Sequence, residues 1–295
     1  MNHIYRLAWK EYGDPTLPTI VLLMGLGMPS AAWPESLIQL LVRKGLHVIA
    51  PDNRDCGNSE HCEEKVSTWT LAKSIALYLL GGSVRAPYVM DDMASDVEAL
   101  LDRLKLDRVH VAGFSLGGMI AQALAVRAPH RVISLTCISS ASGNPRTGLG
   151  KIGAVRAVLK NCTTGKDSAV RYSCLEALLK KIGSPNVRYS RVELARYLQI
   201  FNEANISEDS VRRQLMAILA GGNRCRQLRQ LVTPTLVVHG DADPLLPLRA
   251  GEEIAQCVEN AKLLVVHGMG HDLPEVFLGR IGEAVAQHCY SGVLR

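Results

Sequence analysis

The stretch VHVAGFSLG, residues 109–117, decides the fold of this chain. It joins an apolar run, typical of a buried strand, to the pattern G-x-S-x-G, and a helix is predicted to follow from Gly118 to Val126. A turn this tight between a strand and a helix needs residues nearly free of side chain two positions before and after the serine. The turn lifts the hydroxyl of Ser115 clear of the sheet, so the pattern predicts a nucleophile. The alternative is a serine in a purely structural turn.

Two loops downstream of Ser115 offer the partners that a serine nucleophile needs. A serine hydroxyl requires a base to take its proton and a carboxylate to orient that base, and after such a turn the chain order is Ser, then Asp or Glu, then His. The loop GDADP, residues 240–244, follows the predicted strand 235–239, and the loop GMGHD, residues 268–272, follows the predicted strand 263–267. Both loops lie past the carboxyl ends of strands, where ligands bind in open α/β sheets.

Each loop contains more than one candidate. Asp243, which precedes a proline and a leucine, is favoured as the orienting carboxylate over Asp241, which follows a glycine and serves equally well to shape the turn. His271 is favoured as the base because it lies beyond its strand, next to glycines that permit close approach to another loop. His239 and His267 lie at strand ends and fit structural roles. The predicted catalytic residues are Ser115, Asp243 and His271.

Acyl transfer also requires hydrogen-bond donors for the oxyanion that develops on the substrate, usually two backbone amides. The amide of Leu116 follows the nucleophile at the start of the predicted helix. The second donor is expected in the loop MGLGMP, residues 24–29, which follows the predicted strand 19–23, and the amide of Leu26 is the candidate. A glycine-rich loop with no part in the chemistry is the alternative.

Five segments give the chain a resemblance to a known family over essentially its whole length. They are MGLGMPSAAWP, HVIAPDNRDCGNS, GFSLGGMIAQ, HGDADPLLP and GMGHDLP, in this order. The chain resembles the α/β-hydrolase family. Because its early loop begins Met24-Gly25 in place of the common His-Gly, it looks closest to a branch of cofactor-free serine esterases similar to aclacinomycin methylesterase. The resemblance implies Ser115 as the nucleophile, Asp243 and His271 as its partners, and Leu26 and Leu116 as the oxyanion donors.

Strands and helices alternate along most of the chain, which is typical of a mainly parallel sheet with helices on both faces. The expected strands are continuous apolar runs, as strands buried on both faces should be. We therefore predict an α/β class protein with the α/β-hydrolase fold, a mainly parallel central sheet, helices on both faces and a helical cap. The predicted core comprises residues 1–143 and 232–295, and the predicted cap comprises residues 144–231.

The cap is predicted because strands and helices stop alternating in residues 144–231. Long helical stretches, each beginning at a serine, take their place, and no convincing strand interrupts them. The expected cap helices are 168–182, 190–202 and 207–220. One further helix, 69–80, is expected in the insertion 60–87, which departs from the esterase branch and is placed near the rim of the active site.

Positive charge is concentrated in the predicted cap. Residues 146–229 hold 16 Lys or Arg against 6 Asp or Glu, whereas the whole chain has a formal net charge of +5. Solvated helix faces are the simplest interpretation, and a basic rim that attracts substrates with an acidic group is the alternative. No nucleic-acid-binding module accompanies the charge, so nucleic acid is not expected as a partner. The G-x-G-x-x-G pattern at 148–153 follows no strand and lacks an acidic residue about 20 positions further on, so no dinucleotide cofactor is expected.

Location is predicted from what the sequence lacks. The longest apolar run falls well short of the roughly 20 residues that span a bilayer, and no export signal is evident at the start. The eight cysteines are scattered without C-x-x-C spacing, so reduced thiols and no metal site are expected. We predict a cytoplasmic protein.

These features predict a cofactor-free serine hydrolase that cleaves a carboxylic ester of a small or medium-sized apolar molecule through an acyl-enzyme. Other acyl chemistry on the same residues stays open, such as acyl transfer or cleavage of an amide, lactone or C–C bond. A ligand-binding or receptor protein with vestigial turnover also stays open. The expected partner is a small-molecule ester, and a homodimer is an open option. The candidates for the pocket wall are Met28, Trp33, Tyr189, Tyr197 and Phe201.

Overall fold

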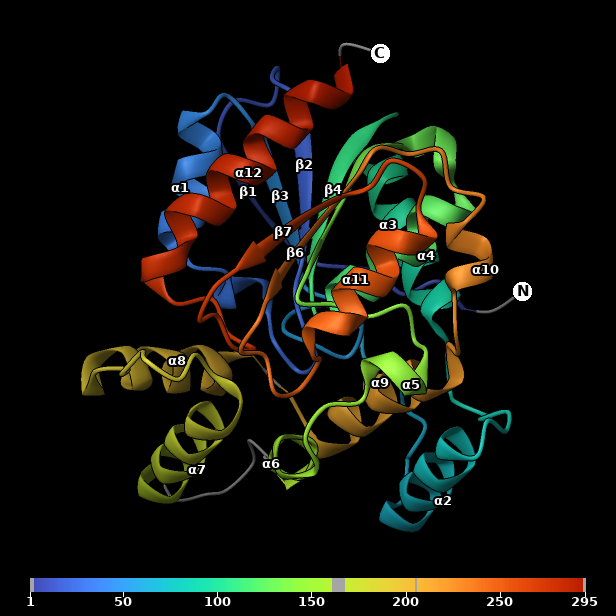
Figure 1. Ribbon diagram of the computed structural model, residues 1–295, viewed down its shortest axis with the longest axis vertical. Helices are drawn as coiled ribbons and strands as arrows, with labels where there is room; N and C mark the ends of the chain where they lie inside the picture. Colours follow the sequence, from blue (N-terminus) through green and yellow to red (C-terminus); the bar gives the residue numbers. More distant parts are fainter. Residues whose placement is uncertain (1–2, 161–167, 205, 294–295) are drawn as a thin grey trace.

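A seven-stranded sheet with the order β1-β3-β2-β4-β5-β6-β7 forms the centre of the computed structural model, which describes residues 3–160, 168–204 and 206–293 (Figure 1). β1 is antiparallel to β3 and every other neighbouring pair is parallel, which confirms the predicted mainly parallel sheet. The strands are β1 (Trp9–Tyr12), β2 (Thr19–Leu23), β3 (His47–Pro51), β4 (Val109–Phe114), β5 (Val132–Ile138), β6 (Thr235–Gly240) and β7 (Lys262–Val266).

Helices cover both faces of the sheet because the central strands are buried along their whole length. β2, with the sequence TIVLL, and β4 expose no residue, so each face needs an apolar cover. In Figure 1, α1 and α12 lie on one side of the sheet, and α3, α4 and α11 lie on the other. These helices are α1 (Glu35–Arg43), α3 (Met90–Arg103), α4 (Leu116–Arg127), α11 (Leu248–Cys257) and α12 (Glu275–Val293).

The segment predicted to form the cap is helical, and its described residues contain no strand. Two of its helices begin where the sequence suggested, because the side chains of Ser190 and Ser207 accept hydrogen bonds from backbone amides of the first turn. The domain boundaries themselves remain a prediction. The helices of this segment are α5 (Pro145–Gly148), α6 (Ile152–Lys160), α7 (Ser168–Ile182), α8 (Arg191–Glu203), α9 (Glu208–Ala220) and, near its end, the short α10 (Cys225–Leu228).

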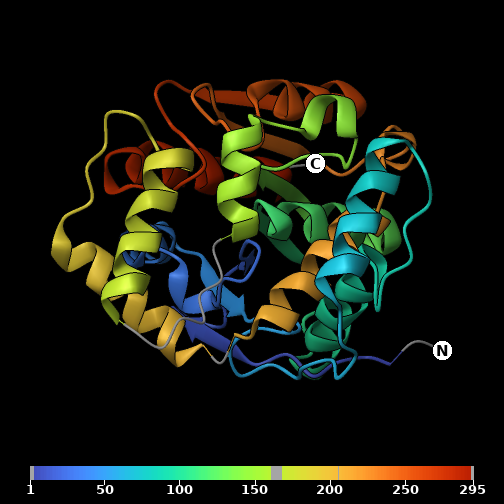
Figure 2. The same ribbon diagram turned by 90° about the horizontal axis from the view of Figure 1, so that it is seen from below.

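The inserted helix is α2 (Thr68–Leu79), and it lies against the cap. Figure 2, which looks onto this end of the molecule, shows α2 beside α9. The two helices share a small apolar cluster that includes Val66, Met216 and Leu219. The helix expected at 69–80 is therefore present, and it packs against the cap helix α9.

A buried ion pair fastens α9 to the core. The guanidinium of Arg213 donates two hydrogen bonds of 2.8 Å to the carboxylate of Asp55, whose side chain has no exposed surface. The hydroxyl of Tyr88 donates a third hydrogen bond, of 2.6 Å, to the same carboxylate. A pair buried to this degree holds its geometry because either partner left alone would be an uncompensated charge away from water.

The cysteines differ from the expectation in one respect. Cys225 of α10 and Cys257 of α11 form a disulfide, because the packing of these helices brings their Cα atoms to 5.5 Å, a separation that allows a bridge. The expectation that the cysteines are all reduced is therefore wrong for this pair, and the argument for a cytoplasmic location loses that support. Cys162 lies outside the described residues. Among the described helices, none has the length and apolar character needed to cross a membrane.

Two neighbouring arginines on α9 provide a test of the ion pair. Replacing Arg213 with Met leaves the Asp55 carboxylate buried without its cation, so we expect a loss of about 3–5 kcal/mol in the free energy of unfolding. Arg212 is partly exposed and pairs with Glu208 and Asp209 on the surface, so Arg212→Met should change that free energy by no more than about 1 kcal/mol. Urea unfolding of both variants measures the difference, and equal losses would contradict this account.

Candidate active site

Ser115 lies in the turn between β4 and α4, with φ of 54° and ψ of −116°. This backbone conformation is strained for a residue with a side chain, and its neighbours hold it in place. A Cβ on Gly117 would lie 1.9 Å from the carbonyl oxygen of Leu23, and a Cβ on Gly113 would lie 2.2 Å from the backbone of Gly117. Both glycines of the G-x-S-x-G pattern are therefore required, because a side chain at either position would collide with backbone atoms next to the serine turn.

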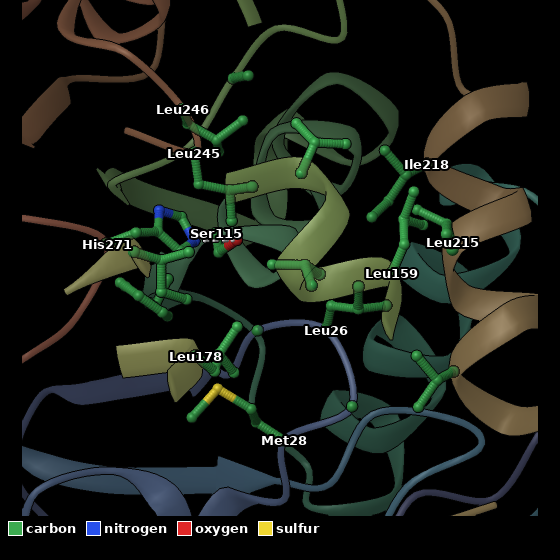
Figure 3. Close-up of a pocket in the computed structure, with 18 of the residues that line it drawn as sticks. Leu26, Met28, Ser115, Leu159, Leu178, Leu215, Ile218, Leu245, Leu246 and His271 are labelled. Atoms are coloured by element: carbon green, nitrogen blue, oxygen red, sulfur yellow. Dashed lines mark hydrogen bonds between the residues drawn. The ribbon is translucent and has the colours of Figure 1, made fainter. Parts of the chain in front are cut away.

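A chain of hydrogen bonds links Ser115 to the two loops singled out in the sequence. The Oγ atom of Ser115 is 3.0 Å from Nε2 of His271, and Nδ1 of His271 is 2.7 Å from Oδ2 of Asp243 (Figure 3). The other carboxylate oxygen of Asp243 accepts hydrogen bonds of 2.8 and 2.9 Å from the amides of Leu245 and Leu246. Because the Asp243 carboxylate accepts a hydrogen bond from Nδ1–H of His271, the tautomer that fits carries its proton on Nδ1. Nε2 is then free to accept the proton of the serine hydroxyl.

The rejected candidates of the same loops lie elsewhere. Asp241 pairs with His267 at 2.8 Å, and the His267 side chain is 78% exposed, so this pair belongs to the surface. His239 is buried beneath the site, where its Nε2 lies 2.8 Å from the carbonyl oxygen of Leu246. Burial lowers the pKa of His239, which keeps this imidazole neutral next to Asp243. The structure thus brings together the three residues that the sequence favoured.

The loop expected to supply an oxyanion donor lies directly against the serine. A Cβ on Gly25 would be only 3.4 Å from the Cβ of Ser115. Neither the amide of Leu26 nor the amide of Leu116 donates a hydrogen bond to another described residue. Leu116 is the first residue of α4, where backbone amides have no partner within the helix and carry partial positive charge. Both amides are therefore available to a ligand beside Ser115.

A cavity of about 300 Å³ opens from Ser115 and His271 into the space beneath the cap. Its wall is mainly apolar, and Figure 3 shows aliphatic side chains from the core and from the cap facing it. Core residues of the wall include Met24, Leu26, Met28, Phe114, Leu245 and Leu246. Cap residues of the wall include Leu159, Leu175, Leu178, Leu179, Leu215 and Ile218, and α2 adds Ile75, Tyr78 and Leu79.

Four of the five expected pocket residues line this cavity, namely Met28, Tyr189, Tyr197 and Phe201. Trp33 does not, and the expectation for it is wrong. It is 2% exposed within the core cluster of α1 and α12, and its indole nitrogen donates to the carbonyl oxygen of Leu22 at 3.3 Å. Trp33 directly follows a short 3₁₀ turn, Ser30–Ala32, whose last residue lines the cavity.

The positive charge of the cap does not face the cavity, because the described lining contains no Lys or Arg. On α9, for example, Arg212 pairs with acidic residues of its own helix and Arg213 pairs with Asp55. The solvated-face interpretation fits the partly exposed Arg212 but not the buried Arg213, and the described cavity wall offers no Lys or Arg to an acidic substrate. The G-x-G-x-x-G segment has a packing explanation as well, since a Cβ on Gly150 would lie 2.1 Å from the carbonyl oxygen of Pro244, next to Asp243.

One residue of the site was missed by the sequence analysis. Asp272 is buried beside His271, and its carboxylate accepts hydrogen bonds from the amide of Ser184 at 2.9 Å, the hydroxyl of Ser184 at 2.6 Å and the hydroxyl of Tyr189 at 2.9 Å. The amide of His271 also donates to the carbonyl oxygen of Ile182 at 2.7 Å. Burial, and then the negative charge of Asp272, raise the pKa of the Tyr189 hydroxyl. The histidine loop is therefore bonded to the end of α7, and only the adjacency of Asp272 to His271 could have indicated this in the sequence.

Comparisons with known proteins agree with this architecture. A family model described as the alpha/beta hydrolase fold matches residues 18–152, and a model described as TAP-like protein matches residues 221–276. The rhodomycin D methylesterase DnrP of Streptomyces peucetius is 26% identical over 95% of this chain and 94% of its own length.

Solved structures share the fold at lower identity. A thermophilic esterase from Thermogutta terrifontis superposes with a TM-score of 0.72 at 18% identity, covering 98% of this chain and 94% of the esterase. The enol-lactonase from Burkholderia xenovorans LB400 superposes with a TM-score of 0.69 at 20% identity, covering 99% of this chain and 97% of the lactonase. These matches confirm the expected fold and the resemblance to methylesterases: the chain has the α/β-hydrolase fold, and its sequence is similar to that of rhodomycin D methylesterase.

Proposed function

We propose that this protein is a cofactor-free serine hydrolase that cleaves a carboxylic ester of a small or medium-sized apolar molecule. The observation that carries the proposal is the hydrogen-bonded chain from Asp243 through His271 to Ser115, which opens onto an apolar cavity. The similarity to a methylesterase supports ester hydrolysis as the reaction.

In the proposed mechanism, Oγ of Ser115 attacks the ester carbonyl carbon while Nε2 of His271 takes the hydroxyl proton. Asp243 holds His271 in the required tautomer and stabilises the imidazolium that forms. The amides of Leu26 and Leu116 donate hydrogen bonds to the carbonyl oxygen as it becomes negative, and each donor of this kind is worth about 3 kcal/mol in the transition state.

The intermediate then collapses, and its C–O bond to the leaving alcohol breaks. His271 gives its proton to the departing alkoxide oxygen, which leaves the acyl group on Ser115 as an ester. A water molecule repeats the sequence: it loses a proton to His271, attacks the acyl carbon and releases the carboxylic acid with Ser115 restored.

The cavity limits the class of substrate that we propose. Its volume of about 300 Å³ lies at the lower end of the range for small-molecule sites. Leucine, isoleucine, methionine and phenylalanine form most of its wall, so the hydrophobic effect favours an apolar group there.

An acyl-chain series tests the nucleophile and the cavity together. With p-nitrophenyl esters from acetate to laurate, we expect turnover that peaks at one chain length, because the apolar cavity has a fixed depth. Ser115→Ala should keep the melting temperature of the wild type within a few degrees and lose at least about 10⁴-fold in kcat/KM, because the nucleophile is gone. Comparable turnover in the folded Ser115→Ala variant would rule out the mechanism.

The two aspartates of one loop form a matched pair of variants. Asp243→Asn keeps the shape of the side chain but favours the wrong histidine tautomer, so we expect kcat to fall by about 10⁴-fold. Asp241→Asn affects the exposed pair with His267, while the remaining amide oxygen can still accept the hydrogen bond from the Gly268 amide, so kcat should stay within about twofold of the wild type. Ester hydrolysis by both variants measures this, and a larger loss in Asp241→Asn than in Asp243→Asn would reverse the assignment.

A further inference from the structure

We infer that Gln214, on the cap helix α9, is a positioning residue for the oxyanion loop, defined here as residues 24–28. The inference rests on the proposed function, in which the amide of Leu26 stabilises the oxyanion. It assigns to the cap a part in the reaction itself, in addition to its place in the wall of the cavity.

Gln214 bridges two segments of the core through its side-chain amide. Its Oε1 atom accepts a hydrogen bond of 2.8 Å from the backbone amide of Gly27, which follows Leu26 directly. Its Nε2 atom donates a hydrogen bond of 2.8 Å to the backbone carbonyl of Arg54. The residue is 1% exposed, so neither hydrogen bond competes with solvent. A buried side-chain amide with both ends engaged has one orientation, and it fixes the peptide that it contacts.

The oxyanion loop depends on such a contact because its backbone is not held by secondary structure. Gly27 has φ of 61°, a left-handed conformation that favours glycine, and it lies in a turn with Leu26. Within the core, the loop is held by the side chain of Asn53, which donates to the carbonyl of Met24 at 2.8 Å, and by the amide of Met28, which donates to the carbonyl of Gly25 at 3.2 Å. The Met28 bond holds the carbonyl of the peptide that carries the Leu26 N–H, and Gln214 holds the N–H of the next peptide, between Leu26 and Gly27. Gln214 therefore supplies the cap's contact with the peptide that directly follows the Leu26 amide.

The rest of α9 keeps Gln214 in place. Arg213, its neighbour, forms the buried ion pair with Asp55 described above. Val211, one turn earlier, lines the cavity and packs so closely on Gly27 that a Cβ there would lie 3.1 Å from a Val211 methyl group. Movement of α9 away from the core would therefore break the Gly27 contact and release the oxyanion loop. The donor geometry of the site is tied to the seated position of the cap.

A purely structural role and a positioning role differ in what they change. Loss of a structural contact lowers the melting temperature and loosens the binding of every ligand in the cavity. Loss of a positioning contact weakens only the stabilisation of charge on the substrate oxygen, so it lowers kcat while KM stays nearly constant.

The experiment compares Gln214→Met with Gln199→Met in ester hydrolysis and inhibitor binding. Methionine has a similar size to glutamine but cannot accept the hydrogen bond from Gly27. Gln199 lies on the exposed face of α8, where its amide contacts Glu203, and it provides the same chemical change away from the loop. The inhibitors are an alkyl trifluoromethyl ketone, to which Ser115 adds to form an oxyanion as His271 takes the proton, and the corresponding methyl ketone, which binds as an unreacted ketone.

For Gln214→Met we expect kcat to fall by about 10- to 100-fold with KM within about threefold of the wild type, because the donor is displaced and not removed. Affinity for the trifluoromethyl ketone should fall by a similar factor, and affinity for the methyl ketone should stay within about twofold. Gln199→Met should match the wild type in all four quantities. If Gln214→Met does not fold, Gln214→Asn, whose shorter amide cannot reach both partners, is measured in the same way with the same expectation.

A folded variant at position 214 that keeps wild-type kcat and trifluoromethyl ketone affinity would overturn the inference and leave the proposed function intact. Equal losses of affinity for the two ketones would also overturn it, because they would indicate a general distortion of the cavity. A wild-type protein that neither hydrolyses esters nor binds the trifluoromethyl ketone would overturn the proposed function, and the inference with it.

Discussion

The contact between Gly117 and the carbonyl of Leu23 is the constraint on which the site depends. Because a Cβ at position 117 would lie 1.9 Å from that oxygen, the start of α4 can approach the end of β2 only through a glycine. This approach forces Ser115 into its strained turn and sets it beside the loop that leaves β2. A single backbone contact therefore brings the nucleophile and the loop of the proposed oxyanion donor to the same place, and side chains such as Asn53 and Gln214 then hold that loop.

Several contacts fasten the described part of the cap to the core, and two of them lie next to proposed catalytic groups. Arg213 anchors α9 through Asp55, and Gln214 on the same helix contacts the loop that contains Leu26. At the opposite side of Ser115, Asp272 joins the histidine loop to Ser184 at the end of α7. The reacting groups belong to the core, but their loops are bonded to cap helices. A substrate that enters by displacing the cap would disturb both loops, which links closure of the cavity to the geometry of the reaction.

The features that could be predicted from the sequence are those that residues close together in the chain determine. The elbow around Ser115 follows from its own glycines, and Asp243 and His271 follow from their places after the apolar strands β6 and β7, although β7 is partly exposed in the structure. Long-range contacts were not predictable from pattern: Gln214 lies 187 residues from Gly27, and Asp272 lies 88 residues from Ser184. Trp33 was misassigned because an apolar residue after the oxyanion loop can face either the cavity or the core, and hydrophobicity does not distinguish the two. The disulfide was missed because helix packing, and not cysteine spacing, brings its two sulfur atoms together.

The central claim, that Ser115 is a nucleophile activated by His271, is tested most directly by covalent labelling with a fluorophosphonate. Trypsin cuts after Arg108 and Arg127, so the serine falls in the single peptide 109–127, and mass spectrometry locates the adduct there. The account predicts a phosphonyl adduct on that peptide in the wild type and none in folded His271→Ala under the same conditions, because the base that activates the hydroxyl is gone. An adduct on another peptide, or equal labelling of Ser115 in both proteins, would contradict it.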